Sequence, residues 1–201
     1  MPRFFAIIPA AGNSTRMGAP KLLLPMGGGT MMERTLAAWK NSRVERVVVV
    51  VRPEDLELAD LCRTCGAEVV VTPTAPPEMK DSVQYGLRHI EANFAPIAED
   101  AWLLAPADMP NLSPRIINAM IATHEPNKIR ILIPTLGGQR GHPVLFPWPL
   151  AAEVFSLRSN EGLNVLRQRH DNQEIPCDDV EPTGTSAFSD IDTPEEYERF
   201  R

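Results

Sequence analysis

Two cations and two acids in this chain stand where a phosphorylated ligand and a metal ion could be held. Arg16 and Lys21 follow the apolar run 4–10, in a loop of mostly small residues. Asp108 ends a central apolar stretch, and Asp192 precedes Thr-Pro near the carboxyl end of the chain. Carboxylate oxygens are the ligands that magnesium prefers, and fixed cations neutralise charge that develops on phosphate oxygens. These four side chains therefore indicate phosphoryl-type transfer, which needs positioning and charge neutralisation more than a general base.

The loop after the first apolar run leaves room for a ligand close to the backbone. Ala10, Ala11 and Gly12 have small side chains or none, and Ser14 lies in the same loop. Exposed amides with fixed positive charge suit an anion such as a triphosphate. The loop is not a common phosphate loop, because Gly12 and Gly18 have five residues between them where that motif has four. It also lacks a G-x-G-x-x-G pattern.

Asp108 follows a strand-like segment and precedes a helix that Ser113 and Pro114 are expected to begin. We therefore expect Asp108 at the tip of a central strand, facing a cleft, as an acid without a buried partner. The alternative interpretation is an ordinary turn aspartate beside proline.

Asp192 is the second candidate acid. Thr193 and Glu196 fit a capping box at the start of a helix. The alternative interpretation is therefore that Asp192 only stabilises the positive, N-terminal end of that helix. If 186–191 forms a strand, Asp190 and Asp192 share one face of it, which makes Asp190 the substitute for Asp192.

The composition fits one well-packed domain and excludes some partners. With 201 residues and 43% apolar content, the chain is long enough for a single domain, 1–201, with a full core. A formal net charge of −6 argues against nucleic acid or an anionic membrane as a partner. The apolar runs, such as Val47–Val51, are far shorter than the roughly 20 residues that span a bilayer, and no signal-peptide pattern is present. Three cysteines, an odd number, indicate a reducing compartment, so we expect a cytoplasmic protein.

Strand-like and helix-like segments alternate along most of the chain. This alternation predicts a three-layer α/β/α sandwich with a mostly parallel, Rossmann-like sheet. Ligands bind beyond the carboxyl ends of the strands in such sheets, where the candidate residues are expected. Strands are expected at 4–10, 44–51, 67–71, 101–105, 129–134, 143–146 and 186–191, and helices at 31–40, 54–65, 82–93, 114–123, 150–155 and 162–168.

Four motifs, in this order, resemble the MobA-like nucleotidyltransferases, and most closely their molybdenum-cofactor cytidylyltransferase branch. They are A-A-G-N-S-T-R-M-G-A-P-K at 10–21, A-D-M-P at 107–110, R-G-H-P-V-L-F at 140–146 and D-I-D-T-P-E-E at 190–196. The resemblance implies a fold of the nucleotide-diphospho-sugar transferase type. It also implies attack by a substrate phosphate on the α-phosphate of a nucleoside triphosphate, with release of pyrophosphate. Ala10-Ala11-Gly12, where the guanylyl branch has A-G-G, favours CTP as the donor, and the branch implies molybdopterin as the acceptor.

The resemblance also implies a role for each matching residue. Asp108 and Asp192 would bind Mg²⁺, the expected cofactor, while Lys21 and Arg16 would be the catalytic cations. The nucleotide would contact Ala10, Ala11, Gly12, Ser14, Arg16, Lys21, Ser82 and Asp108, and the acceptor would contact Gly141, His142 and Pro143.

One segment departs from the family pattern. The family has G-M-x-S-S-L-x-x-G-L where this chain has E-M-K-D-S-V-Q-Y-G-L at 78–87. Ser82 is kept, but Glu78 and Asp81 are added acids. Acid beside a triphosphate is unfavourable unless Lys80 or the metal offsets it.

Three alternatives stay open at this point. The donor could be GTP or another triphosphate, transferred to a different phosphorylated acceptor. The scaffold could serve a nicotinamide-dependent oxidoreductase, although the G-x-G-x-x-G pattern is missing. The chain could also be a non-catalytic nucleotide-binding module that functions together with a molybdoenzyme. For the transferase itself, the resemblance implies transient contact with a molybdoenzyme or its chaperone as a further partner.

Overall fold

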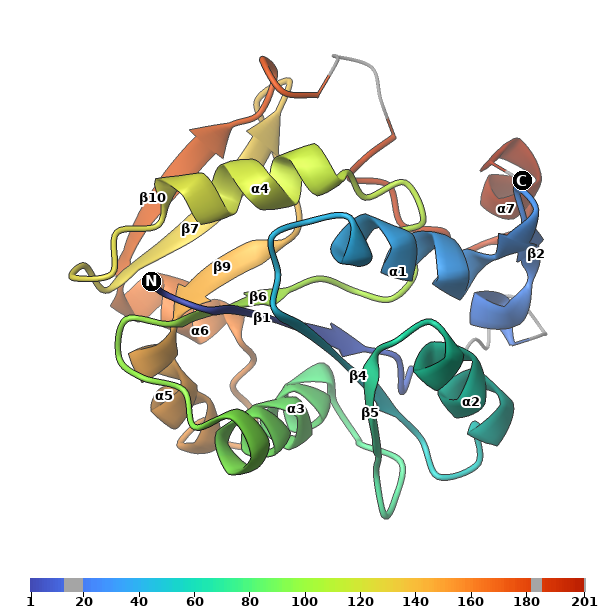
Figure 1. Ribbon diagram of the computed structural model, residues 1–201, viewed down its shortest axis with the longest axis horizontal. Coiled ribbons are helices and arrows are strands. Elements are labelled where there is room, and N and C mark those ends of the chain that lie inside the picture. The colour runs from blue at the N-terminus through green and yellow to red at the C-terminus, as the bar shows by residue number, and fades with distance from the viewer. Residues whose placement is uncertain (13–19, 182–185, 201) are drawn as a thin grey trace.

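The computed structural model describes residues 1–12, 20–181 and 186–200, and its centre is an eight-stranded sheet (Figure 1). Across the sheet the order is β10-β7-β9-β6-β1-β4-β5, with β8 paired to β7. These strands are β1 (Phe4–Pro9), β4 (Arg46–Val51), β5 (Glu68–Val71), β6 (Ala101–Leu104), β7 (Arg130–Leu136), β8 (Gln139–Arg140), β9 (Val144–Pro147) and β10 (Asp171–Pro176). A separate hairpin pairs β2 (Pro25–Met26) with β3 (Gly29–Thr30).

Helices cover both faces of the sheet. They are α1 (Met31–Lys40), α2 (Leu56–Thr64), α3 (Met79–Phe94), α4 (Pro114–Thr123), α5 (Ala151–Phe155), α6 (Asn164–Arg169) and α7 (Pro194–Phe200), with short 3₁₀ helices η1 (Lys21–Leu23) and η2 (Trp148–Leu150). Alternate residues of β1 separate the two cores, because successive strand side chains point to opposite faces. Phe4, Ala6 and Ile8 pack with α1, α2 and α4, whereas Phe5 and Ile7 pack with α3, α5 and α6. Figure 1 shows α1 and α4 on one side of the sheet and α3 and α5 on the other.

The long strands β1, β4, β6, β7 and β10 pair mainly in parallel, as the alternation of elements predicts. β1 pairs in parallel with β4 and β6, β4 with β5, and β7 with β10. β9 runs antiparallel to β6 and β7. The three-layer α/β/α prediction is therefore confirmed. The start of β9 consequently lies at the same edge of the sheet as the carboxyl ends of β1, β6 and β7.

The last strand is not where the sequence predicts it. Residues 186–191 form no strand, and the final strand is β10, which pairs with β7 at the edge of the sheet. The sequence of β10, D-N-Q-E-I-P, is polar because only Ile175 is buried. Residues 186–191 are apolar in part because Ala187 and Ile191 are buried as a loop, without pairing. The argument that Asp190 and Asp192 share a strand face is therefore wrong.

Local signals in the sequence account for several element ends. A capping box between Thr30 and Glu33 begins α1, and Ser113 caps α4 in front of Pro114. Gly66, after α2, has a φ of +85° that glycine adopts without strain. No helix among the described residues is long and apolar enough to cross a membrane.

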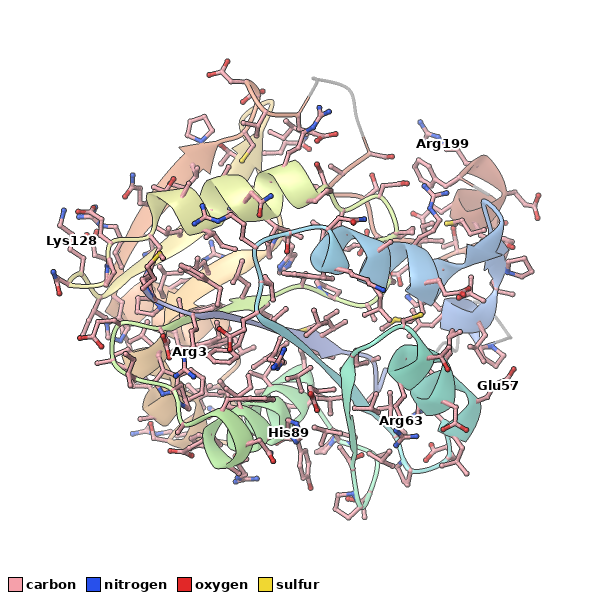
Figure 2. All side chains as sticks on the ribbon, viewed as in Figure 1. Arg3, Glu57, Arg63, His89, Lys128 and Arg199 are labelled. Atoms are coloured by element: carbon pink, nitrogen blue, oxygen red, sulfur yellow. The ribbon has the colours of Figure 1, made fainter. Side chains whose placement is uncertain are left out.

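Charged side chains lie around the periphery of the molecule, where Figure 2 labels Arg63 and Lys128. Arg63 pairs with Asp60 at 2.7 Å and Lys128 with Glu125 at 2.6 Å. Each of these two surface cations is therefore balanced by an acid on its own segment.

Candidate active site

A cavity of about 320 Å³ lies at the carboxyl ends of β1 and β6. The sequence predicts a ligand site at this edge, and seven of the predicted residues line the cavity: Ala10, Ala11, Gly12, Lys21, Ser82, Asp108 and Asp192. The other lining residues are Pro9, Leu22, Pro76, Pro77, Glu78, Met79, Pro106 and Ala107. Ser14 and Arg16 lie outside the described residues, so their predicted roles stay predictions.

Lys21 joins the two candidate acids. Its Nζ lies 2.5 Å from Oδ2 of Asp108 and 2.8 Å from Oδ1 of Asp192. It also donates to the carbonyl oxygen of Ile191 at 3.2 Å. The side chains of Lys21, Asp108 and Asp192 are 14%, 18% and 24% exposed, so the cluster is sheltered but open to the cavity. One cation and two carboxylates from three distant parts of the chain thus converge on one wall.

The charge of Lys21 is secured by these contacts. Burial alone would lower the pKa of Lys21, but the hydrogen bonds and charges of Asp108 and Asp192 outweigh it and raise that pKa above 10.5. The lysine begins η1, where the N–H of Leu24 donates to its carbonyl oxygen at 3.1 Å. Leu22 is buried beside it and anchors the turn. Lys21 is therefore a fixed ammonium group at neutral pH.

Asp108 lies four residues beyond the end of β6, in the loop that leads to α4. Two contacts hold this loop: the hydroxyl of Thr35 donates to the carbonyl oxygen of Ala107 at 3.0 Å, and the N–H of Ile191 donates to that of Asp108 at 3.1 Å. The expectation of an acid without a partner is wrong, because Oδ2 accepts from Lys21. Oδ1 is buried and has no hydrogen-bond partner among the described residues. A buried carboxylate oxygen of this kind is available to a ligand.

The capping box predicted at the start of α7 positions Asp192. Oε2 of Glu196 accepts from the N–H of Asp192 at 2.8 Å and from that of Thr193 at 2.9 Å, and Thr193 Oγ1 accepts from the N–H of Glu196 at 3.2 Å. The hydrogen bond from Asp192, followed by that from Thr193, lowers the pKa of Glu196. α7 is itself held by a hydrogen bond from the Tyr197 hydroxyl to the carbonyl oxygen of Pro25.

Asp190, the substitute for Asp192 in the sequence interpretation, does not share this position. It is exposed and is absent from the described lining of the cavity. The loop conformation of residues 186–193 separates the two acids, whereas a strand would have aligned them. Among the two, the structure brings only Asp192 to Lys21.

The acids that depart from the family pattern have local partners. Oδ2 of Asp81 accepts from the N–H of Glu78 at 2.9 Å and so caps the first turn of α3. Oε2 of Glu78 lies 3.0 Å from Nζ of Lys80. Asp81 does not line the cavity, whereas Glu78 does. Lys80 thus partly neutralises the charge of Glu78, the acid that faces the cavity, as the sequence analysis expected.

Lys80 also has a structural role that the sequence did not predict. Its side chain is 7% exposed, and Nζ donates to the carbonyl oxygens of Arg158, Ser159 and Glu161 at 2.6–2.8 Å. These bonds attach the start of α3, which carries the cavity residues Met79 and Ser82, to the loop between α5 and α6. Lys80 therefore ties this wall of the cavity to the α5–α6 loop.

Residues Gly141–Pro143 do not reach the described lining of the cavity. A Cβ at Gly141 would lie 2.2 Å from the ring of Phe188, so only glycine fits there. Nδ1 of His142 lies 3.2 Å from the carbonyl oxygen of Leu104, at the end of β6. Burial lowers the pKa of His142, and the charge of Arg167 lowers it further, against opposing contributions from Asp108 and Asp190. The imidazole is therefore neutral at pH 7.

The β5–α3 loop supplies Pro76 and Pro77 to the cavity, and sequence reasoning missed both. The available signal was topological, because this loop follows a parallel strand and must emerge at the same edge as the loops after β1 and β6.

Comparison with known proteins agrees with this geometry. Residues 6–174 match the model of the MobA-like NTP transferase domain family. The purine catabolism protein PucB of Bacillus subtilis is 28% identical over 100% of this chain and 97% of its own length. The 2-C-methyl-D-erythritol 4-phosphate cytidylyltransferase of Dechloromonas aromatica is 35% identical over 61% of this chain, which spans about half (54%) of that protein.

Solved structures show the same fold. Rv0371c of Mycobacterium tuberculosis has a TM-score of 0.76 and 22% identity, with 99% of this chain and 97% of that one covered. A second structure of Rv0371c, in complex with manganese, has a TM-score of 0.71 and 23% identity, with 98% and 97% covered. The family match includes Lys21 and Asp108 but ends before Asp192. This chain belongs to the MobA-like NTP transferase family of nucleotidyltransferases.

Proposed function

We propose that this protein transfers CMP from CTP to the phosphate of a molybdopterin-type acceptor and releases pyrophosphate, with Mg²⁺ as cofactor. The observation that carries the proposal is the cluster of Lys21, Asp108 and Asp192 on the wall of the cavity. It combines a fixed cation with two carboxylates beside a small-residue loop, the set that transfer between phosphates requires.

The residues present fit a hard divalent cation. Asp108 Oδ1 is buried without a hydrogen-bond partner among the described residues, so this oxygen can bind a cation. Asp108 and Asp192 would hold the ion. No group of three or more His, Cys, Asp or Glu side chains suited to a metal occurs in the described ranges, so phosphate and water oxygens would supply the other ligands. When bound, the ion supplies neutralisation of phosphate charge.

The chain's own residues then position the reacting groups. A phosphate oxygen of the acceptor forms a bond to the α-phosphorus of CTP, and the bond from that phosphorus to the bridging oxygen of pyrophosphate breaks. The acceptor phosphate is already ionised at neutral pH, so no general base is needed. Lys21, with Arg16, would stabilise the charge that develops on the transferred phosphate. This assignment requires Lys21 to stay protonated, which its contacts with Asp108 and Asp192 favour.

Small residues at the end of β1 support CTP as the donor. Ala10 and Ala11 are 4% and 8% exposed and line the cavity. The methyl group of Ala11 occupies space that a glycine would leave open for a larger purine base. Next to it, a Cβ at Gly12 would meet nothing within 4 Å, so the backbone there is open to a ligand.

Thermal unfolding with CTP, GTP, ATP, UTP and NADPH, each with Mg²⁺, tests the donor. Free CTP at about 100 times its Kd should stabilise the protein by roughly 2.7 kcal/mol, and GTP should do so less. Pyrophosphate release on addition of a phosphorylated pterin acceptor then tests transfer. A preference for GTP would assign the protein to the guanylyl branch of the family. An increase in Tm with NADPH and none with any triphosphate would overturn the proposal. If CTP bound but no pyrophosphate were released, the protein would be a nucleotide-binding module without transferase activity.

A further inference from the structure

A second cavity, of about 280 Å³, lies beside α6 on the face of the sheet that α3 and α5 also cover. Two arginines and three side-chain amides line it, above Ile133 of β7: Arg140, Arg167, Asn164, Gln168 and Asn172. No carboxylate lines this cavity among the described residues. The second cavity is thus polar and positively charged, in a protein whose net charge is −6.

Arg167 distinguishes this cavity from an ordinary charged surface. It is half-buried, and its guanidinium has no hydrogen-bond or ion-pair partner within the described ranges. The other arginines nearby are paired: Arg140 with Glu174 at 2.5 Å and Arg169 with Glu161 at 2.7 Å. A guanidinium presents a planar set of donors that matches a phosphate or carboxylate. A sheltered guanidinium without a partner therefore favours an oxyanion in this cavity.

One short segment connects the second cavity with the end of β6, which leads into the active-site cavity. β7, β9, β6 and β1 follow one another across the sheet (Figure 1), and β9 starts at the edge where β6 and β7 end. Arg140 is followed directly by Gly141–Pro143, which leads into β9 beside β6. The His142 ring contacts the end of β6 and is subject to the charges of both Arg167 and Asp108. The segment Arg140–Pro143 therefore runs from the second cavity to the end of β6, whose following loop lines the active-site cavity.

We propose that the cavity at Arg167 is an anion subsite, which binds an oxyanionic group of the acceptor other than the phosphate that reacts. Arg167 supplies the charge, and Asn164 and Gln168 supply amide donors beside it. The amide nitrogen of Asn172 is engaged within the protein instead, by hydrogen bonds to the carbonyl oxygens of Arg167 at 2.6 Å and of His170 at 2.9 Å. The assignment to the acceptor rests on the proposed function; the binding of an anion does not.

Arginine Nε–Hε resonances in labelled protein test the subsite directly, with Arg167→Lys used to assign the signal. Inorganic phosphate and acetate are titrated in separate arms, which distinguishes a phosphate from a carboxylate as the preferred group. We expect a saturable shift of the Arg167 signal in at least one arm. Arg115, an exposed arginine on α4, serves as the control and should not respond. No saturable shift at Arg167, or the same shift at Arg115, would overturn the subsite.

A second measurement separates this inference from the donor assignment. Arg167→Met and Arg115→Met, which remove the same charge, should both bind CTP with Mg²⁺ within about twofold of the wild-type Kd. Arg167→Met alone should raise the acceptor KM, by about tenfold or more. A tenfold loss of CTP affinity in Arg167→Met would place Arg167 at the donor and overturn the inference. If the wild type failed to bind CTP while the Arg167 signal still responded, the anion subsite would stand and the proposed donor would not.

Discussion

Nζ of Lys21 lies 2.5 Å from Oδ2 of Asp108, although the two residues are 87 positions apart in the chain. The same ammonium reaches Asp192, 171 positions away. This one cation therefore ties the loop after β1 to the loop after β6 and to the segment before α7. A substitution at any of the three side chains therefore also removes or changes a contact of Lys21.

We expect Asp108→Asn to reduce Mg²⁺-dependent pyrophosphate release by about 10²-fold or more, because a neutral amide oxygen binds Mg²⁺ more weakly than a carboxylate does. The fold should survive. Loss of one charge-assisted hydrogen bond to Lys21 costs about 1–2 kcal/mol, or roughly 2–8 °C in Tm for a chain of this size. Steady-state pyrophosphate release and thermal unfolding measure the two effects. Full activity in the variant would remove Asp108 from the metal site.

Asp192→Asn and Asp190→Asn form a matched pair that separates the two candidate acids. Asp192 lines the active-site cavity, whereas Asp190 is exposed outside it. Mn²⁺ binding, followed by electron paramagnetic resonance, should weaken by about tenfold or more in Asp192→Asn and remain within about twofold in Asp190→Asn. The reverse order would assign the ligand to Asp190.

Lys21→Met should lower kcat and kcat/KM together, by about 10²-fold or more, as expected for a cation that acts on charge developing in the transition state. Because the pKa of Lys21 is raised above 10.5, no loss of activity below pH 10 should be due to its deprotonation. By the same linkage, its contribution to stability is complete below pH 10.5 and is lost as the pH rises through the folded value. An increase in nucleotide KM with kcat unchanged would make Lys21 a ground-state binding residue only.

His142 should make the protein sensitive to mild acid. Its pKa in the folded state is lowered below 6.5, chiefly by burial, so the unfolded chain binds the proton more strongly. The stability contribution of His142 is therefore complete above pH 6.5 and is lost as the pH falls towards the folded value. Between pH 7.5 and 5.5, the wild type should lose more Tm than His142→Gln. As a control, His170→Gln removes a histidine that pairs with Glu153. Equal losses in the wild type and His142→Gln would contradict the assignment.

Lys80→Met should destabilise the protein by about 2–4 kcal/mol, because three loop carbonyl oxygens lose a charged donor in a buried position. A decrease of roughly 5–15 °C in Tm is expected. Lys40→Met, an exposed lysine on α1, should change Tm by about 2 °C or less. If the two variants were equally stable, the attachment of α3 to the α5–α6 loop would be of no energetic consequence.

The sequence by itself determined the architecture and much of the site. The uninterrupted apolar residues of β4 and β6 specify buried strands, and the alternation with helices specifies a parallel sheet. Local chemistry also predicted the caps at Ser113 and Thr193, because a cap depends on residues within one turn. Ala10–Gly12, Lys21, Ser82 and Asp108 were placed at one edge by motif and topology alone.

Only the tertiary structure decided which charges meet. The pairing of Lys21 with both Asp108 and Asp192 depends on the packing of three loops, and no local pattern encodes contacts between distant segments. β10 was missed because an edge strand that buries one side chain keeps a polar sequence, and residues 186–191 were mistaken for a strand because a buried loop is apolar too. The same reason applies to Lys80, which donates to loop carbonyl oxygens, and to Arg167, whose guanidinium has no partner among the described residues. In both cases the surroundings of the side chain come from distant segments that the fold brings together.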